Sequence, residues 1–447
     1  MSEITYLTEG NITKQIIRLS IPLLIGNIIQ QFYNTINMMI VGKYVGEDAF
    51  AAVGVSGSVM NLFIAIIIGL CVGFSILFAN AYGAKNYEKL RKTIFLTATI
   101  GISITVILSL TGFIFVKSIL QAIETPDNLY NDCIVYLRII FVGMIFCLLY
   151  NLMSSILQAL GRTNIMLYVI VISMVTNIFF NYLLVAVLDA KVMGAALATL
   201  LTQAISALIC VLYIARFLPE LKLTKNDMVF DKNILKTSWQ YGATSSLQQS
   251  SLFFGKLLVQ RAINALGTTA VMAFTADICI EQLVLAFGDS GAAAIAVFIA
   301  QNYGHNETER VKDGLKQGIK LMVATGVTLS IILFVIKPWV LALLISKDNI
   351  EVTLIALSYL SIMCFFYPLS FLANSFQGFF RGIGMIHLAF GATLSQIIIR
   401  VIITYNLTDL LQLKAVAFAT GIGWIAMITI QLISLKRKTK EKLEGFI

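Results

Sequence analysis

Long runs of apolar residues, separated by short polar or glycine-containing stretches, recur along the whole chain. Each run holds about 20 or more mostly apolar residues, enough for a helix to cross a hydrocarbon core of roughly 30 Å. Helices satisfy their own backbone hydrogen bonds in lipid, so such runs favour helices. The pattern predicts twelve spans, at about residues 14–40, 52–81, 93–117, 131–158, 165–188, 192–214, 234–262, 270–299, 314–337, 349–377, 386–411 and 414–435.

Two short sequences indicate that the chain is duplicated. Residues 80–83 (NAYG) and 301–304 (QNYG) each follow an apolar run and precede a charged one. Their tyrosines are 221 positions apart, as are Gly46 and Gly267. Internal repeats of this size are typical of secondary transporters. Six spans per half is an even number, so we expect parallel repeats related by an axis along the membrane normal.

One long polar break divides the predicted spans. It contains Pro219, Asn226 and several basic residues, and we interpret it as a cytoplasmic linker at 215–236. The expected organisation is an all-α polytopic membrane protein. An N-terminal six-helix lobe at 1–214 precedes the linker, and a C-terminal six-helix lobe with a basic cytoplasmic tail follows at 237–447.

Composition and charge agree with a membrane protein. With 58% apolar and 12% charged residues and a mean hydropathy of +0.88, the chain has too few charges to cover a soluble surface. A cytoplasmic N-terminus would place 22 of the 32 Lys and Arg on the inner side and seven outside. This asymmetry predicts that both termini are cytoplasmic. The net charge of +9 then reflects orientation and contact with membrane lipid, and we expect no nucleic-acid partner.

Charged residues inside the spans are functional candidates, because intramembrane charge is costly. Asp277, Glu281 and Asp289 lie on the eighth span, and Asp277 and Glu281 share one helix face. We expect these acids to bind the coupling cation, and Glu281 is the strongest candidate. A carboxylate in low dielectric takes up a proton and can exchange it for a cation. The predicted charge partners are the basic residues within spans: Lys256, Arg400 and Arg138.

The alternative interpretation of these charges is structural. Lys256 and Asp277 flank the turn near Gly267, so they are predicted at similar depth and could form an ion pair. Lys256 and Arg400 would then only neutralise Asp277 and Asp289.

Other chemistries find little support in the sequence. Two His and six Cys without CxxC spacing argue against a metal site, and we expect reduced, packed cysteines. No GxxxxGK[ST] phosphate loop is present. We therefore expect a protein that is not an enzyme and has no cofactor other than H⁺ or Na⁺ as coupling ion.

Several motifs together resemble one transporter family. These are Pro22 in the first span, Tyr33-Asn34-Thr35-Ile36-Asn37, the NAYG and QNYG loops, and Leu157-Gln158-Ala159-Leu160-Gly161-Arg162. The chain resembles the MATE multidrug and toxin extrusion transporters, in the bacterial branch with DinF-like and MepA-like proteins. The resemblance covers nearly the whole chain. It implies a V-shaped pair of six-helix lobes and cation-coupled efflux of organic cations.

The resemblance also implies a substrate site in the N-terminal lobe. Carried over by local position, its residues are Tyr33, Asn37, Tyr136, Asn151, Ser154, Asn177, Asn181 and Thr199. DinF-like members have carboxylates at two of these positions, where this chain has Asn37 and Asn181. An amide keeps the shape and hydrogen bonding of a carboxyl group but cannot release a proton or carry charge.

This departure leaves three possibilities. Coupling has moved to the eighth-span acids, coupling is altered in this chain, or the sequence carries introduced substitutions. The bland alternative is that Asn37, Asn177 and Asn181 only join helices. Pro22 and Pro368 are likewise either simple kinks or hinges of the transport cycle, as the resemblance suggests.

The favoured function is a secondary active multidrug efflux antiporter that exports organic cations or other amphipathic compounds in exchange for H⁺ or Na⁺. The alternative is a flippase for lipid-linked sugars of the wider superfamily, which would favour a strongly cationic cavity. The expected location is the bacterial inner (cytoplasmic) membrane, as a monomer.

Overall fold

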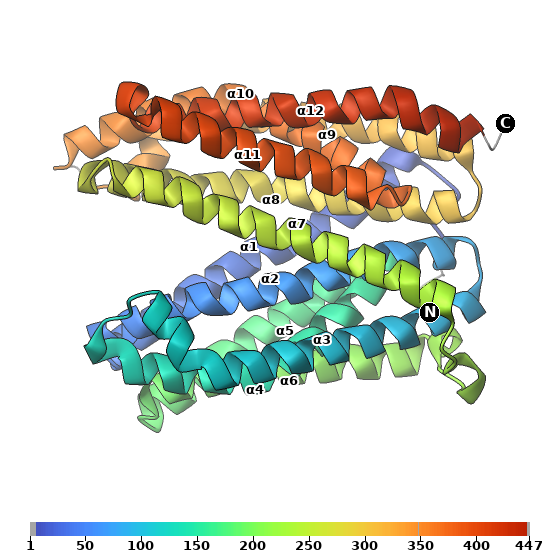
Figure 1. Cartoon of the computed structure of the whole chain (residues 1–447), viewed down its shortest axis with the longest axis horizontal. Coiled ribbons are helices and arrows are strands. Elements are labelled where there is room, and N and C mark those ends of the chain that lie inside the picture. The colour runs from blue at the N-terminus through green and yellow to red at the C-terminus, as the bar shows by residue number, and fades with distance from the viewer. Residues whose placement is uncertain (1–5, 347, 445–447) are drawn as a thin grey trace. The chain divides into compact units, whose positions relative to one another are not determined.

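The computed structural model describes residues 6–346 and 348–444, so the last three residues of the predicted basic tail lie outside it. Twelve long α-helices account for most of the described chain (Figure 1), which confirms the all-α prediction. They are α1 (Ile12–Tyr44), α2 (Glu47–Gly83), α3 (Tyr87–Ala122), α4 (Asp127–Ala159), α5 (Thr163–Asn181), α6 (Lys191–Phe217), α7 (Lys232–Asn264), α8 (Thr268–Gly304), α9 (Thr308–Ala342), α10 (Ile350–Gly382), α11 (Ile386–Leu411) and α12 (Leu413–Glu444).

Eleven of these helices are long and apolar enough to cross a membrane, judged over the described residues. The exception is α7, which the hydrophobic pattern had predicted as a span. Its first half is rich in Ser, Thr and Gln. This polar half lies against α2.

The backbone of the connecting loops repeats with the sequence. Gly46 and Gly267 precede α2 and α8 with φ of 115° and 94°, values that favour glycine. Lys85 and Asn306, also 221 positions apart, both have positive φ, 55° and 64°. Equivalent loops of the two halves therefore adopt equivalent backbone conformations.

The chain forms two compact units. The α2–α6 unit contains residues 25–249, and the α8–α12 unit contains residues 250–447 together with those up to Leu24, within the described part of the chain. The change from one unit to the other falls inside α1 and inside α7, and the linker belongs wholly to the α2–α6 unit. The predicted lobe boundaries at 214 and 237 stay a prediction.

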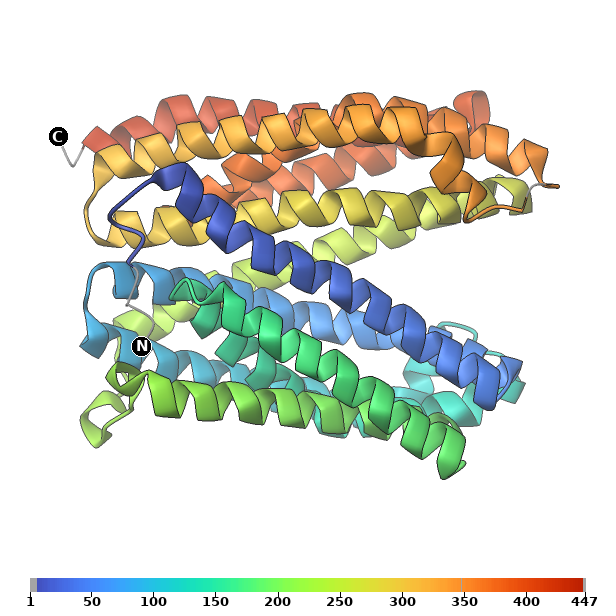
Figure 2. The ribbon, with the colours of Figure 1, turned by 180° about the vertical axis from the view of Figure 1, so that it is seen from behind.

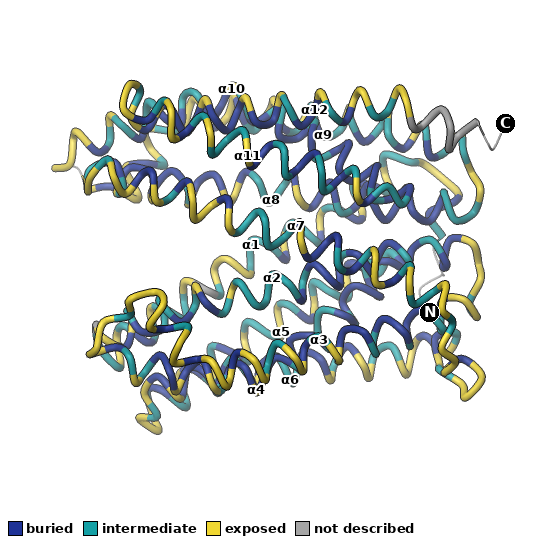
Figure 3. The backbone as a smooth tube through the Cα atoms, in the orientation of Figure 1, coloured by how far each residue is buried: buried dark blue, intermediate teal, exposed yellow. Residues whose placement is uncertain are grey.

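Each unit is built around one or two central helices. In the α2–α6 unit, α4 packs against α2, α3 and α6. In the α8–α12 unit, α10 packs against α8, α9 and α12, and α11 lies beside α12 (Figures 1 and 2). The centre of α10 buries Tyr359, Tyr367 and Phe371 completely. Exposed and buried positions alternate along the outer helices (Figure 3), and α3 exposes apolar side chains such as Ile107 and Ile114, as a lipid-facing helix should.

A pair of glycines lets α7 approach α2. A Cβ at Gly69 would lie 2.4 Å from the Cα of Ser246, and one at Gly73 would lie 2.3 Å from the carbonyl oxygen of Tyr241. The Ser246 hydroxyl donates a hydrogen bond of 2.8 Å to the carbonyl of Ile66. Small residues four apart are a common helix-packing device in membranes. This motif makes a polar α7 compatible with burial inside the unit.

Replacing Gly73 with Leu is expected to destabilise the protein by about 1–3 kcal/mol, because the side chain would collide with the α7 backbone. Thermal unfolding in detergent measures the effect. Gly57→Leu on the same helix is the matched control, since its Cβ would meet nothing within 4 Å. Equal melting temperatures for the two variants would contradict the close packing.

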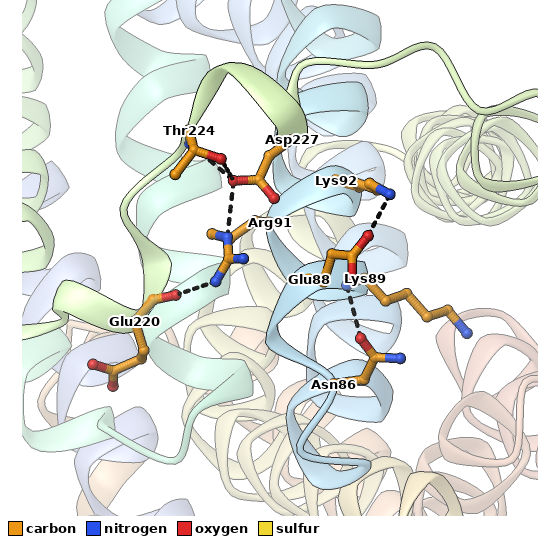
Figure 4. A network of polar contacts seen from close by, with 8 residues as sticks. All are labelled: Asn86, Glu88, Lys89, Arg91, Lys92, Glu220, Thr224 and Asp227. Atoms are coloured by element: carbon orange, nitrogen blue, oxygen red, sulfur yellow. Dashed lines mark hydrogen bonds and ion pairs between the residues drawn. The ribbon is translucent and has the colours of Figure 1, made fainter.

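The linker between α6 and α7 is folded onto α3 (Figure 4). It contains two short 3₁₀ turns, Pro219–Leu221 and Lys225–Asp227. Asp227, which is 2% exposed, accepts hydrogen bonds from the backbone and hydroxyl of Thr224 and pairs with Arg91 at 2.9 Å. Arg91 also donates to the carbonyl of Glu220 at 3.2 Å. These contacts fix the linker conformation.

Asp227→Asn is expected to lower the stability by about 1–2 kcal/mol, because it weakens charge-assisted hydrogen bonds. Burial raises the pKa of this carboxyl, but the hydrogen bonds from Thr224 and the Arg91 guanidinium outweigh it and lower the pKa below its ordinary value. A lowered pKa stabilises the fold above the unfolded pKa, about 3.9, and this contribution is lost as the pH falls through the folded pKa. The melting-temperature difference from wild type should therefore be full at neutral pH and shrink below about pH 4.

A second arginine clamp holds the chain before α1 in the α8–α12 unit. Arg310 donates to the carbonyls of Leu7 and Gly10 at 3.1 and 3.0 Å and to the side chain of Asn302 at 3.0 Å. Asn302 in turn donates to the Leu7 carbonyl. The N-terminal segment thus lies against the loop between α8 and α9 (Figure 2).

Candidate functional site

Amide side chains of α1 and α5 form a connected ladder in the α2–α6 unit. The Asn181 amide nitrogen donates to the side-chain oxygens of Asn37 at 3.0 Å and Asn177 at 2.7 Å. Asn177 donates to the hydroxyl of Thr202 on α6 at 3.2 Å. Asn177 and Asn181 are at most 1% exposed. The structure therefore brings three of the predicted substrate-site residues into direct contact.

Tyrosines pack against this ladder. Tyr33 interacts with Asn37 and with Thr199, and Tyr136 interacts with Tyr33 and with the same Thr199. Tyr136 is 5% exposed. Of the eight predicted substrate-site residues, six are thus linked to one another by contacts: Tyr33, Asn37, Tyr136, Asn177, Asn181 and Thr199.

The two remaining predicted residues lie on α4 with other contacts. Asn151 donates to the Cys147 carbonyl of its own helix at 2.8 Å. Ser154 is buried and interacts with Tyr150 and Cys210. Sequence reasoning missed Tyr150, which also interacts with Tyr33, and Thr202. The position of Tyr150 next to Asn151 could have indicated it.

The ladder can bind a neutral or hydrogen-bond-donating group. The Asn181 side-chain oxygen is buried and has no hydrogen-bond partner among the described residues. A short π-helix, Tyr182–Val187, follows directly after Asn181, and such irregular turns are frequent at functional sites. Amide oxygens and tyrosine rings can receive an N–H donor or a cationic group, but none of these side chains can titrate as an acid near neutral pH.

The acid pair of α8 is buried in the other unit. Asp277 is 0% and Glu281 8% exposed, and their mutual electrostatic interaction agrees with the predicted shared helix face. The Tyr359 hydroxyl on α10 donates to a Glu281 oxygen at 3.2 Å. Neither oxygen of Asp277 has a hydrogen-bond partner among the described residues.

Aromatic residues of α8, α10 and α12 pack beside these acids. Phe274 and Tyr359 meet edge to face with centroids 5.7 Å apart, and Tyr367 and Trp424 lie 6.4 Å apart. Tyr367 is fully buried and interacts electrostatically with Glu281. Sequence reasoning missed Tyr359, because a tyrosine 78 positions away gives no signal of contact before the helices are packed. The arrangement can hold a proton or a cation against two carboxyl groups.

The predicted charge partners of the eighth-span acids stay predictions, except that the structure does not pair Lys256 with Asp277. Lys256 interacts electrostatically with Asp289, and Arg400 with Tyr359. Among the ion pairs of the described residues, none involves Lys256, Arg400 or Arg138. Lys256 is exposed while Asp277 is fully buried, so similar depth along a hairpin does not place them on facing sides. Arg138 instead lies over the ring of Phe113 at 5.3 Å.

The third acid, Asp289, belongs to a different cluster. It is exposed, accepts a long hydrogen bond of 3.4 Å from Asn374, and interacts electrostatically with Lys256 and Arg381. Its contacts therefore differ from those of the buried pair of Asp277 and Glu281, and its predicted role in cation coupling stays a prediction.

The two predicted hinge prolines lie inside continuous helices. Pro22 is in the interior of α1 and Pro368 in the interior of α10. Pro22 lies two residues before Leu24, the last residue of α1 assigned to the α8–α12 unit. The helix therefore loses a backbone donor close to the point where it changes unit.

Comparison with known proteins identifies the family of this chain. A family model described as MatE matches residues 22–183 and again 245–406. The chain belongs to the MatE family. The double match also confirms the predicted duplication, since the same pattern is found once in each half.

Relatives of the MatE chain carry transporter names. A probable multidrug resistance protein of Bacillus subtilis, YoeA, is 29% identical over 336 residues, which cover 74% of this chain and 73% of that protein. The multidrug export protein MepA of Staphylococcus aureus (strain bovine RF122 / ET3-1) is 22% identical and covers 97% of this chain and 94% of that protein.

The fold is shared with solved structures. A MOP superfamily transporter from Pyrococcus furiosus Vc1 superposes with a TM-score of 0.90 at 24% identity, covering 99% of both chains. That transporter is described as having a binding pocket of reverse polarity that suggests a different function. At this identity the likeness establishes the fold, and with the apolar helices it shows a multi-pass membrane protein.

Proposed function

We propose that this protein is a secondary active multidrug efflux antiporter that exports organic cations or other amphipathic compounds in exchange for H⁺ or Na⁺. The observation that carries the proposal is the buried acid pair on α8. Asp277 and Glu281 lie four residues apart on α8 at 0% and 8% exposure, and the tyrosines Tyr359 and Tyr367 interact with Glu281. A buried acid pair that forms no ion pair among the described residues is suited to binding and releasing a cation.

The family supports the substrate class. Relatives in the MatE family are named multidrug resistance and multidrug export proteins. The neutral ladder of Asn37, Asn177 and Asn181, with Tyr33 and Tyr136 beside it, offers hydrogen-bond acceptors and aromatic faces to a bound compound. Aromatic faces bind delocalised cations without requiring a charged side chain.

The roles of the two sites follow from their chemistry. The α8 acids exchange a proton or sodium ion, and the amide ladder binds substrate without changing charge. In this scheme Asp289 is an accessory acid rather than part of the coupling pair, because it interacts with Asn374 and with the basic residues Lys256 and Arg381. No cofactor beyond the coupling ion and no enzymatic reaction is part of the proposal.

The proposed location is the bacterial cytoplasmic membrane, as a monomer with both termini inside. The excess of Lys and Arg on one set of loops supports this orientation. Accessibility of single cysteines introduced into the loops of whole cells would test it.

The deciding experiment is transport by purified protein in proteoliposomes. A pH gradient and a sodium gradient are imposed in separate experiments. One of the two is expected to be sufficient to drive a cationic dye such as ethidium against its own concentration gradient. Transport that responds to neither gradient would contradict cation coupling. Movement of a lipid-linked sugar across the same bilayers, without dye transport, would contradict the efflux function itself.

A further inference from the structure

The linker between α6 and α7 exposes three consecutive apolar side chains. Met228, Val229 and Phe230 are 49%, 53% and 64% exposed. Single exposed apolar residues are ordinary, but three in a row in a polar loop are unfavourable in water unless something covers them. We call these three residues the apolar triplet.

The triplet is held outward by contacts on both of its sides. Asp227, immediately before it, points inward to Arg91 and Thr224 (Figure 4). Asp231, immediately after it, accepts hydrogen bonds from the backbone of Asn233 and Ile234 at 2.8 and 3.1 Å at the start of α7. Both neighbouring carboxylates are therefore engaged by the protein, and the triplet is presented by a fixed loop.

The triplet continues the lipid-facing surface of α3. Phe230 meets Phe95 edge to face with ring centroids 5.8 Å apart. Phe95 lies at the beginning of the apolar part of α3, a helix whose further course exposes Ile102, Val106 and Ile107. With the apolar part of α3 as the membrane span, Phe230 falls at the level where the hydrocarbon region gives way to the headgroups.

Basic side chains flank the triplet on both sides in sequence. Lys222, Lys225, Lys232 and Lys236 are exposed, and none takes part in an ion pair among the described residues. The segment 216–236 holds three acids, Glu220, Asp227 and Asp231, against five basic residues, and Asp227 is already paired with Arg91 on α3, so the exposed charge stays positive. Apolar side chains beside unpaired lysines are the combination that binds an anionic membrane surface.

We propose that the linker is a docking surface for anionic phospholipid. The apolar triplet inserts at the headgroup boundary, and the flanking lysines bind headgroup phosphates. Because the linker is joined to α3 through Arg91 and leads directly into α7, this contact sets the position of the first turn of α7 relative to the bilayer surface. The proposal concerns lipid contact and does not depend on the transported substrate.

The test places a fluorophore on the triplet in the full-length protein. Val229→Cys is labelled with bimane in a Cys279→Ser background, since Cys279 is the exposed cysteine among the described ones. The protein is reconstituted in phosphatidylcholine nanodiscs with and without phosphatidylglycerol, where both faces are accessible. Glu307→Cys, at the exposed start of α9, is the matched control.

We expect doxyl-labelled lipid to quench the label at position 229 strongly and the label at 307 weakly, with the reverse order for aqueous iodide. Phosphatidylglycerol should increase lipid quenching at 229. Replacing Lys222, Lys225 and Lys232 by Gln should lower the affinity for anionic lipid by roughly fivefold for each lysine. A higher fraction of phosphatidylglycerol should then be needed for the same increase in quenching. Unchanged thermal unfolding of the variant shows that the fold is intact.

Three outcomes would overturn the proposal. Equal iodide quenching at both positions would mean that the triplet is in water. Lipid quenching that is the same with and without phosphatidylglycerol would rule out binding to the anionic headgroup. Protection from both quenchers that increases with protein concentration would assign the surface to a second copy of the chain.

Discussion

Replacing Glu281 with Gln is expected to abolish gradient-driven efflux while leaving the protein folded. In the wild-type chain, the Tyr359 hydroxyl donates a hydrogen bond of 3.2 Å to Glu281. Gln keeps a side-chain oxygen that can accept this bond, so the packing between α8 and α10 is preserved. The amide cannot bind and release a proton or offer a negative charge to sodium. Dye efflux from proteoliposomes under an imposed pH or sodium gradient should fall to that of protein-free vesicles.

Two controls separate coupling from folding. Glu351→Gln removes an exposed acid in the first turn of α10 and should leave efflux unchanged. Asp277→Asn should melt at or above the wild-type temperature, because no ion pair of Asp277 with a basic residue occurs in the described part of the chain. A loss on the order of 3–5 kcal/mol would instead indicate a broken buried ion pair. Wild-type coupling in Glu281→Gln would refute the assignment and return attention to the amide ladder.

Asn37 and Asn181, where the resemblance to DinF-like members implies acids, are expected to respond in opposite ways to a carboxylate. Asn37 uses its side-chain oxygen to accept a bond from Asn181, and an aspartate keeps that acceptor. Asn181 uses its nitrogen to donate to the side chain of Asn37 and to the side chain and carbonyl of Asn177, and an ionised aspartate would face these three acceptor oxygens. At neutral pH, Asn37→Asp should be tolerated, whereas Asn181→Asp should lose about 3–5 kcal/mol of stability.

Thermal unfolding as a function of pH measures this asymmetry. The stability of Asn181→Asp should recover as the pH is lowered, because a protonated carboxyl can donate again. Asn37→Asp serves as the matched control for adding a carboxyl group at the same ladder. Equal stability of the two variants at neutral pH would contradict the donor and acceptor roles in the ladder. If Asn37→Asp also changes the pH dependence of efflux, the ladder takes part in coupling.

The sequence-based prediction and the structure agree most closely on the helices, because hydrophobicity along a short stretch of chain determines where a spanning helix forms. Apolar runs long enough to span a bilayer must form helices there, so eleven of the twelve predicted spans correspond to apolar helices. The helices extend beyond the apolar windows, as α3 does at 87–122 against a predicted span at 93–117. Their ends continue into the polar region, where hydropathy carries no signal.

The candidate site was predicted unevenly. The resemblance placed Asn37, Asn177 and Asn181 at one site, and the structure joins them by hydrogen bonds. Lys256 and Asp277 were expected to lie at similar depth, yet one is exposed and the other buried. Depth along a helix can be counted from the sequence, but the direction of a side chain around the helix axis depends on its neighbours.

The amino-acid sequence by itself determined the duplicated all-helical architecture, the neutral character of the amide positions and the presence of acids on the eighth span. These properties depend on composition, periodicity and residue chemistry. Only the tertiary structure decided that Tyr359 meets Glu281, that α7 packs on Gly69 and Gly73, and that α1 and α7 each belong to both units. Contacts between residues distant in the chain depend on how helices rotate and approach one another, and that is fixed by close packing of the whole unit.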